Sequence, residues 1–128
     1  GLLIFNLPHL TVYGEDVKAF NNHIHDNNLK NFGVKGSIVS TVPRGSGVII
    51  MATKKVALYD NIIENHKTIN SSIVSYEIYV PPKNKKKKKK KKALPNGIRQ
   101  IENDYESDTQ YSAYPGRVFI YNNQFKNK

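Results

Sequence analysis

A run of eight consecutive lysines, Lys85–Lys92, most constrains what this chain can fold into. Adjacent like charges repel one another and bury no apolar surface, so the run cannot lie inside a folded core. It divides the 128 residues into residues 1–82, a poly-lysine linker at 83–92 that we expect to be disordered, and a polar, Tyr-rich tail at 93–128. The tail is expected to pack back on the first part or to fold on a partner.

The basic charge of the chain lies almost entirely in the linker. The formal net charge is +10, and residues 83–92 hold nine lysines and no acidic residue. Residues 1–82 carry seven basic and six acidic residues, and residues 93–128 carry four of each. A basic excess commonly indicates nucleic-acid binding, and here that expectation belongs to the linker.

Three readings of the lysine run stay open. It suits phosphate contact without sequence preference, and the candidate residues are Lys85, Lys86, Lys87 and Lys88. Its composition is also that of a nuclear import signal, which favours the nucleus over the cytoplasm. The third reading is a low-complexity insertion with no dedicated role.

The remaining composition narrows the class of protein. The chain has no cysteine, so it has no disulfide framework and no thiolate metal site, which fits an intracellular protein. No apolar run approaches the ~18 residues that a membrane helix needs, so no membrane contact is expected. No internal repeat is evident.

The apolar pattern of residues 1–82 predicts the order β-α-β-β-α-β. Val17, Phe20 and Ile24 recur at helical spacing, whereas other segments are short, apolar and rich in β-branched residues. The expected helices are 13–28 and 54–66, and the expected strands are 2–7, 34–42, 48–52 and 73–80. This order predicts an α+β, ferredoxin-like sandwich, in which a four-stranded antiparallel sheet has two helices on one face. Residues 117–121 form one further strand-like run in the tail.

Two motifs in this order carry a family resemblance. "LLIFNL" at 2–7 matches a first-strand hexamer, and "RGSGVIIM" at 44–51 matches the frame of a third-strand octamer. On these motifs residues 1–82 resemble the RNA recognition motif (RRM) family. The resemblance implies that the open sheet face binds single-stranded RNA, and that the chain is a component of a larger ribonucleoprotein with protein subunits as partners.

The aromatic residues on which the RRM family stacks RNA bases are absent from this sequence. Leu3, Ser46 and Val48 occupy the three places where the family stacks bases on aromatic rings, and each such contact is worth about 1–3 kcal/mol. The sequence leaves two alternatives for the open face. Either Phe5 and Tyr79 form a reduced stacking surface, or the face is an apolar patch covered by protein.

The candidate site residues follow from these alternatives. Arg44, Lys54 and Lys55 flank the third strand and are candidates for phosphate contact. Besides these and the four lysines above, the candidate RNA-binding residues are Phe5, Ser46, Val48 and Tyr79. The candidate protein-contact face consists of Leu3, Phe5, Val48 and Ile50.

No pattern of catalytic or metal-binding residues stands out. His23 and His25 form an H-x-H pair, but on the expected helix positions i and i+2 face different ways, which argues against a metal site. His9 and His66 are isolated and are expected at the surface. No cofactor and no enzymatic activity are expected.

The leading interpretation is a weak, largely non-specific RNA-binding protein with a divergent RRM. The first alternative is a pure protein-interaction module of the same fold without intrinsic RNA binding. The second is a ferredoxin-like domain that binds a small molecule.

Overall fold

The structure is a computed structural model that describes residues 1–79 and 105–127. Within these ranges the chain forms nine β-strands, three short 3-10 helices and no α-helix. None of these helices has the length and apolarity needed to span a membrane. The strands are β1 (Leu2–Phe5), β2 (Glu15–Phe20), β3 (His23–His25), β4 (Ser46–Met51), β5 (Lys54–Tyr59), β6 (Ile62–Glu64), β7 (Ile69–Val74), β8 (Gly116–Tyr121) and β9 (Gln124–Lys126). The 3-10 helices are η1 (Ile38–Thr41), η2 (Tyr76–Tyr79) and η3 (Tyr105–Ser107).

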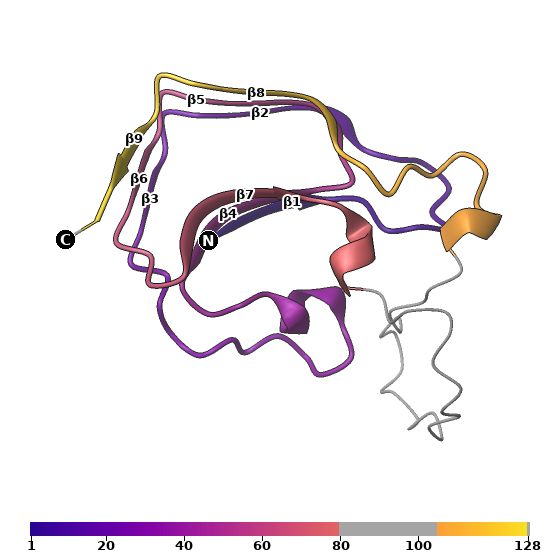
Figure 1. The fold of residues 1–128 in the computed structure, drawn as a ribbon, viewed down its shortest axis with the longest axis horizontal. Helices are drawn as coiled ribbons and strands as arrows, with labels where there is room; N and C mark the ends of the chain where they lie inside the picture. The colour runs from indigo at the N-terminus through magenta and orange to yellow at the C-terminus, as the bar shows by residue number, and fades with distance from the viewer. Residues whose placement is uncertain (80–104, 128) are drawn as a thin grey trace.

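The strands form three parallel sheets of three strands each, in the orders β1-β4-β7, β2-β5-β8 and β3-β6-β9. Consecutive strands belong to different sheets, so three strands make one coil and the next coil stacks on it in parallel register. The first coil is β1–β3, the second is β4–β6 and the third is β7–β9. Figure 1 looks along the stack, with β2, β5 and β8 along the top, β3, β6 and β9 on the left, and β1, β4 and β7 below. The architecture is therefore a parallel β-helix of three coils.

One strand–turn–strand unit recurs in all three coils. It reads VKAFNNHI at 17–24, VALYDNII at 56–63 and VFIYNNQF at 118–125. The pairing register aligns these copies residue by residue, so that Ala19, Leu58 and Ile120 lie in one row across the middle sheet. The chain thus has an internal repeat, contrary to the expectation from sequence.

The main core fills the space between the three sheets. All three sheets contribute, because alternate side chains of each strand point into the coil. The buried cluster consists of Ile4, Val48, Ile50, Val56, Leu58 and Ile63. The second coil supplies five of these six residues, because it alone has a described coil on both sides.

A second cluster covers the outside of β4. Ile38 of η1, Tyr76 of η2 and Ala113 pack there with Met51 and Ala52. The segments that carry them are the two long connections of the chain, residues 26–45 between β3 and β4 and residues 75–115 between β7 and β8. Since both faces of β4 are covered, all six of its residues are buried.

The structure overturns the expected ferredoxin-like fold. The segment expected as the helix 13–28 forms β2 and β3, and the segment expected as the helix 54–66 forms β5 and β6. Residues 34–42, expected as a strand, contain η1, and residues 76–79 of the expected last strand form η2. The sheets are parallel, whereas the expected sheet was antiparallel. The RRM-like, ferredoxin-like description of residues 1–82 is therefore wrong at the level of the fold.

The octamer that suggested the RRM frame does contain a strand, namely β4. Its side chains alternate as expected, but no open face results. Val48 and Ile50, which were expected to point outward, have no exposed surface and lie in the main core. Ile49 and Met51 point to the opposite side and are also buried.

Candidate functional site

The open end of the third coil exposes residues whose equivalents are core residues. Ile73, Ile120 and Phe125 are 47%, 38% and 47% exposed. Their neighbours in the same rows of the second coil, Ile50, Leu58 and Ile63, are fully buried. The second coil has a described coil on both sides, whereas no described coil covers the outer side of the third one. An apolar surface of this kind on a row of strand edges is typical of a binding surface.

Polar groups at the same end also lack partners. The side-chain oxygens of Asn70 and Ser71, both on β7, are buried without a hydrogen bond among the described residues. A buried polar group without a partner costs about 1–3 kcal/mol. The same edge therefore combines uncovered apolar side chains with unsatisfied hydrogen-bonding groups.

A ladder of three asparagines joins the coils at the turn between the middle sheet and the β3-β6-β9 sheet. The backbone N–H of Asn22 donates to Oδ1 of Asn61, and the backbone N–H of Asn61 donates to Oδ1 of Asn123, each at 3.0 Å. The side-chain amides point back along the stack. Nδ2 of Asn61 donates to the Ala19 carbonyl at 3.0 Å, and Nδ2 of Asn123 donates to the Leu58 carbonyl at 2.8 Å.

The hydrogen bonds of the ladder follow the same pattern from one coil to the next. The amide oxygens of Asn61 and Asn123 each accept a hydrogen bond from the backbone N–H of the asparagine one coil earlier. Their amide nitrogens each donate to the carbonyl three residues before that asparagine. At the first coil, where no earlier coil is described, Nδ2 of Asn22 donates to the Phe20 carbonyl of its own coil and to Oδ1 of Asn61, each at 3.0 Å. The two ends of the ladder are chemically complementary.

An aromatic row runs beside the asparagines on the outside of the middle sheet. Phe20 and Tyr59 stack with ring centroids 5.0 Å apart, and Tyr59 and Tyr121 stack at 4.9 Å. The ring planes differ by 7° and 1°, so the rings follow the spacing of the strands. Because the rings cover one another, they do not offer flat faces side by side to a base or a sugar.

The outer end of the first coil is hollowed. The hollow is lined by residues of β1, β2 and β3, among them Leu2, Ala19 and Ile24. Ala19 is the smallest side chain of its row, where the second and third coils have Leu58 and Ile120. The row therefore has a small side chain, Ala19, in the first coil and a large one, Ile120, in the third coil.

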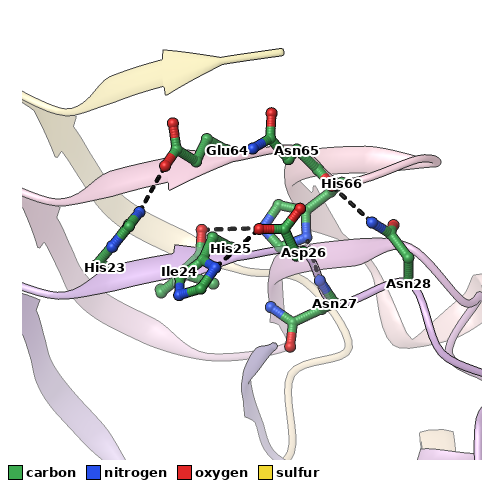
Figure 2. A network of polar contacts seen from close by, with 9 residues as sticks. All are labelled: His23, Ile24, His25, Asp26, Asn27, Asn28, Glu64, Asn65 and His66. Atoms are coloured by element: carbon green, nitrogen blue, oxygen red, sulfur yellow. Dashed lines mark hydrogen bonds and ion pairs between the residues drawn. The ribbon is translucent and has the colours of Figure 1, made fainter. Parts of the chain in front are cut away.

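A polar network lies where β3 and β6 end (Figure 2). Nε2 of His23 lies 2.7 Å from Oε1 of Glu64, and Nδ1 of His25 lies 2.9 Å from Oδ2 of Asp26. His23 and His25 are on a strand, so positions i and i+2 share a face and the ring centroids are 4.2 Å apart. The expected helical separation of this pair is therefore wrong. Among the described residues, however, no group of three or more His, Asp or Glu side chains is arranged to hold a metal ion.

His66 in the same network is structural. It is buried, with Nε2 3.1 Å from the Ile24 carbonyl, and Nδ1 accepts the backbone N–H of Asn27 at 3.4 Å. Asn28 adds a bond from Nδ2 to the Asn65 carbonyl at 2.7 Å. These bonds join the turns of the first and second coils. The expectation that His66 lies at the surface is wrong.

Tyrosines join the long connection 75–115 to the loop after β1. Rings of Tyr76, Tyr105 and Tyr111 meet edge to face, and the Tyr111 hydroxyl donates to the Asn6 carbonyl at 3.0 Å. The hydrogen bond to Glu77 raises the pKa of Tyr105 to about 12. The hydrogen bonds from Tyr105 and Tyr114 in turn lower the pKa of the Glu77 carboxyl. Burial raises the pKa of Tyr111 above its ordinary value. This cluster holds residues 75–79 and 105–114 of the connection together.

Those residues expected to bind RNA that the structure describes do not lie together on one open sheet face. Arg44 and Lys54 are exposed, and Lys55 forms an ion pair with Glu15 at 3.5 Å. Ser46 is buried and donates its hydroxyl to the Pro43 carbonyl at 2.8 Å.

The aromatic and apolar members of the expected sites do not form one open sheet face either. Phe5 packs against the second cluster, and Tyr79 ends η2. Of the expected protein-contact face, Val48 and Ile50 are inaccessible and Leu3 is half-buried. The lysines expected to contact RNA, Lys85, Lys86, Lys87 and Lys88, lie outside the described residues.

Comparison with known proteins gives no family for this chain: no family model, curated protein or solved structure matches it. The class is therefore defined by the structure alone. The described residues form a parallel β-helix of three coils, and none of them covers Ile73, Ile120 and Phe125 at the open edge of the third coil.

Sequence reasoning missed Ile73, Ile120 and Phe125 because no single segment identifies them. The signal that identifies Ile120 and Phe125 is the recurrence of aromatic–Asn/Asp–Asn, which occurs at Phe20, Tyr59 and Tyr121, whereas Ile73 lies outside the repeated unit. Aligning the three copies places Ile120 in the row of Leu58 and marks it as an inward residue.

Proposed function

We propose that this chain is a binding module that takes up a further β-coil at the open end of its third coil. The observation that carries the proposal is the exposure of Ile73, Ile120 and Phe125, in rows that are fully buried one coil earlier. An extended segment that pairs in parallel with β7, β8 and β9 covers these side chains. Strand addition to an open sheet edge is a common mode of recognition.

Burial of the three side chains supplies the driving force. About half of each side chain is exposed, and full burial of such a side chain is worth about 1.5–3 kcal/mol. Covering all three therefore gains roughly 2–4 kcal/mol before backbone hydrogen bonds and the entropy of ordering are counted. The edge is suited to a partner that contributes several strands at once.

A synthetic peptide of residues 54–64 tests this proposal. Its sequence alternates in the way a coil requires, and it contains the turn and an inward Leu and Ile. We expect a labelled peptide to bind the chain, and we expect Ile120→Lys to abolish binding because it places a charge at the uncovered row. Phe32→Lys is the matched control, since Phe32 is 96% exposed but lies in the connection 26–45. Absence of binding, or equal loss with both variants, contradicts strand addition.

A second proposed function is charge-driven contact with RNA through Lys85–Lys92. The observation that favours it is the density of positive charge, since residues 83–92 contain nine lysines. Affinity from such a run falls steeply with salt, with a log–log slope of about −0.7 for each phosphate neutralised on a single strand. The same run supports the nucleus as the proposed compartment.

The RNA proposal is tested by measuring single-stranded RNA binding at several salt concentrations, with and without residues 85–92. We expect weak binding that needs the lysines and disappears as salt rises. Binding that survives deletion of the run places the RNA contact elsewhere. Absence of binding even at low salt excludes RNA as a partner.

A further inference from the structure

We propose that the partner of the third-coil end is the first coil of a second copy of this chain, so that copies stack head to tail. The inference rests on the proposed function, because it names the segment that the open end takes up. Two observations support this occupant over an unrelated strand. They are the complementary ends of the asparagine ladder and the complementary sizes of the inward rows.

The ladder specifies three hydrogen bonds across the junction. By the pattern inside the chain, Oδ1 of Asn22 in the second copy accepts the backbone N–H of Asn123. Its Nδ2 donates to the Ile120 carbonyl, as Asn61 does to Ala19 and Asn123 does to Leu58. The backbone N–H of His23 in the second copy donates to the Asn123 carbonyl, as Ile62 does to Asn22 and Gln124 does to Asn61.

The inward rows match at the same junction. Ile73 meets Ile4 of the second copy, and Phe125 meets its Ile24, because these positions share rows within the chain. Ile120 meets Ala19, whose small side chain lines the hollow at the first-coil end. A large side chain therefore enters a recess, and two apolar contacts flank it.

The rows of outward-facing side chains also continue across the junction between two copies. Tyr121 is the last ring of the aromatic row and Phe20 is its first, so stacking copies places Phe20 of the second copy against Tyr121. The neighbouring row places Lys18 of the second copy beside Phe119, an arrangement that favours a cation–π contact. Lys126 falls beside His25 rather than beside a second lysine.

The geometry of the contact predicts the form of the assembly. The two surfaces differ, so the contact is heterologous, and a second copy bound at the third coil presents its own third coil to the next copy. Copies related by a step along the stack form an open linear series and not a closed dimer. The length of the series therefore rises with protein concentration.

The experiment blocks one end at a time in the full chain. Ala19→Lys fills the hollow of the first coil, and Ile120→Lys blocks the third coil; both lysines sit at coil edges from which the charge reaches water. We expect the unmodified chain to form a concentration-dependent series in sedimentation velocity, and each variant alone to be monomeric. Mixed together, the two variants should form one-to-one heterodimers and nothing larger, since each supplies the end that the other lacks.

Folding of each variant is checked by far-UV circular dichroism and cooperative melting. If Ala19→Lys fails to fold, Asn22→Asp replaces it, because a carboxylate cannot donate to the Ile120 carbonyl and so weakens the junction about tenfold. Phe32→Lys is the control for adhesion through exposed apolar loops and should assemble like the unmodified chain.

The outcomes separate the two proposals. An unmodified chain that stays monomeric, or folded variants that fail to pair when mixed, overturns head-to-tail stacking. If the peptide of residues 54–64 still binds in that case, the third coil accepts strands but not from a second copy. If neither the peptide nor the second copy binds, the proposed function fails as well.

Discussion

Asn61 is the single residue on which the stacking of the coils depends most. It is a polar side chain with 1% exposure, and its amide bonds to both neighbouring coils. Oδ1 accepts from Asn22, and Nδ2 donates to the Ala19 carbonyl and to Asn123. No apolar residue of similar size can replace it, because the backbone groups that it satisfies would remain buried without partners.

Replacing Asn61 by Ala should therefore be strongly destabilising. We expect the free energy of unfolding to fall by about 2–4 kcal/mol, from lost hydrogen bonds and newly unpaired backbone groups. Urea denaturation followed by circular dichroism measures this loss.

Asn22→Ala is the matched control for that measurement. Asn22 belongs to the same ladder, but it is exposed and lies at the end of the stack. Its replacement should cost under about 1 kcal/mol at concentrations where the chain is monomeric. Equal costs at the two positions would show that the ladder does not join the coils.

Tyr105 gives a pH dependence at the residue scale. The Glu77 hydrogen bond raises the pKa of Tyr105 from 10 to about 12, so the stabilisation is fully present below pH 10 and is lost as pH rises toward 12. We expect Glu77→Gln to return the pKa of Tyr105 toward 10, because the charged acceptor is removed. A tyrosinate titration followed by NMR at Tyr105 measures this. An unchanged pKa in the variant would show that Glu77 is not the cause.

At the scale of elements, the turns between β2 and β3, β5 and β6, and β8 and β9 share one conformation. Asn21, Asp60 and Asn122 have φ values of 56°, 53° and 52°, in the left-handed region. Asn and Asp are the side chains that best tolerate this region, besides glycine. The same conformation in all three coils keeps the strands in register.

The effect of a substitution at Asp60 on stability should therefore depend on whether the new residue tolerates a positive φ, more than on its polarity. Asp60→Gly should change the free energy of unfolding by less than about 1 kcal/mol, since glycine adopts this φ freely. Asp60→Val should cost about 1–2 kcal/mol or more, because a β-branched side chain is strained there. Thermal unfolding of the two variants measures the difference. A glycine variant as unstable as the valine variant would point to a side-chain role instead.

These turns also explain why the sequence predicts helices at 13–28 and 54–66. Val17, Phe20 and Ile24 recur at i, i+3 and i+7, which a helix satisfies. The structure satisfies the same spacing in another way: Val17 and Ile24 point into the core from two strands, and the turn between them changes the phase of the alternation. Phe20 lies outside, in the aromatic row. Local spacing alone cannot distinguish these two arrangements.

The β-helix could be predicted from the sequence only by comparing segments that lie far apart in the chain. The three copies of the strand–turn–strand unit start at residues 17, 56 and 118, so their separations are unequal. The connection 75–115, which includes the lysine run, accounts for the longer interval. The expected strand at 48–52 and the strand-like run at 117–121 fall on β4 and β8, because short β-branched runs identify strands whatever the fold. Their parallel pairing depends on residues far apart in the chain, which no local pattern contains.

At the scale of the molecule, the three coils behave as a stack in which each layer contacts only its neighbours. Such stacks need their terminal layers covered, because every layer presents the same kind of apolar edge. The second coil is covered on both sides and is the most deeply buried. The third coil carries Ile73, Ile120 and Phe125, which no described residue covers. This asymmetry is the basis of the proposed binding by coil addition.

The central claim is that a second copy of the chain adds its first coil to the open edge of the third coil. Disulfide trapping with Lys18→Cys and Phe119→Cys in one chain tests this claim most directly. The chain has no other cysteine, and both positions lie on the outer row shared with Ala57. Within one copy they are two strand spacings apart, roughly 10 Å, which is too far for a disulfide. Across a head-to-tail junction they are neighbours. The control pair Ala57→Cys and Phe119→Cys should close a disulfide within one chain, which confirms the register of β5 and β8.

The account predicts that mild oxidation of the Lys18→Cys, Phe119→Cys chain gives a series of covalent dimers, trimers and longer species on a non-reducing gel. The control pair should give a cross-linked monomer under the same conditions. If the control closes and the test pair stays monomeric, the β-helix stands and the addition of a second copy at its open end is contradicted.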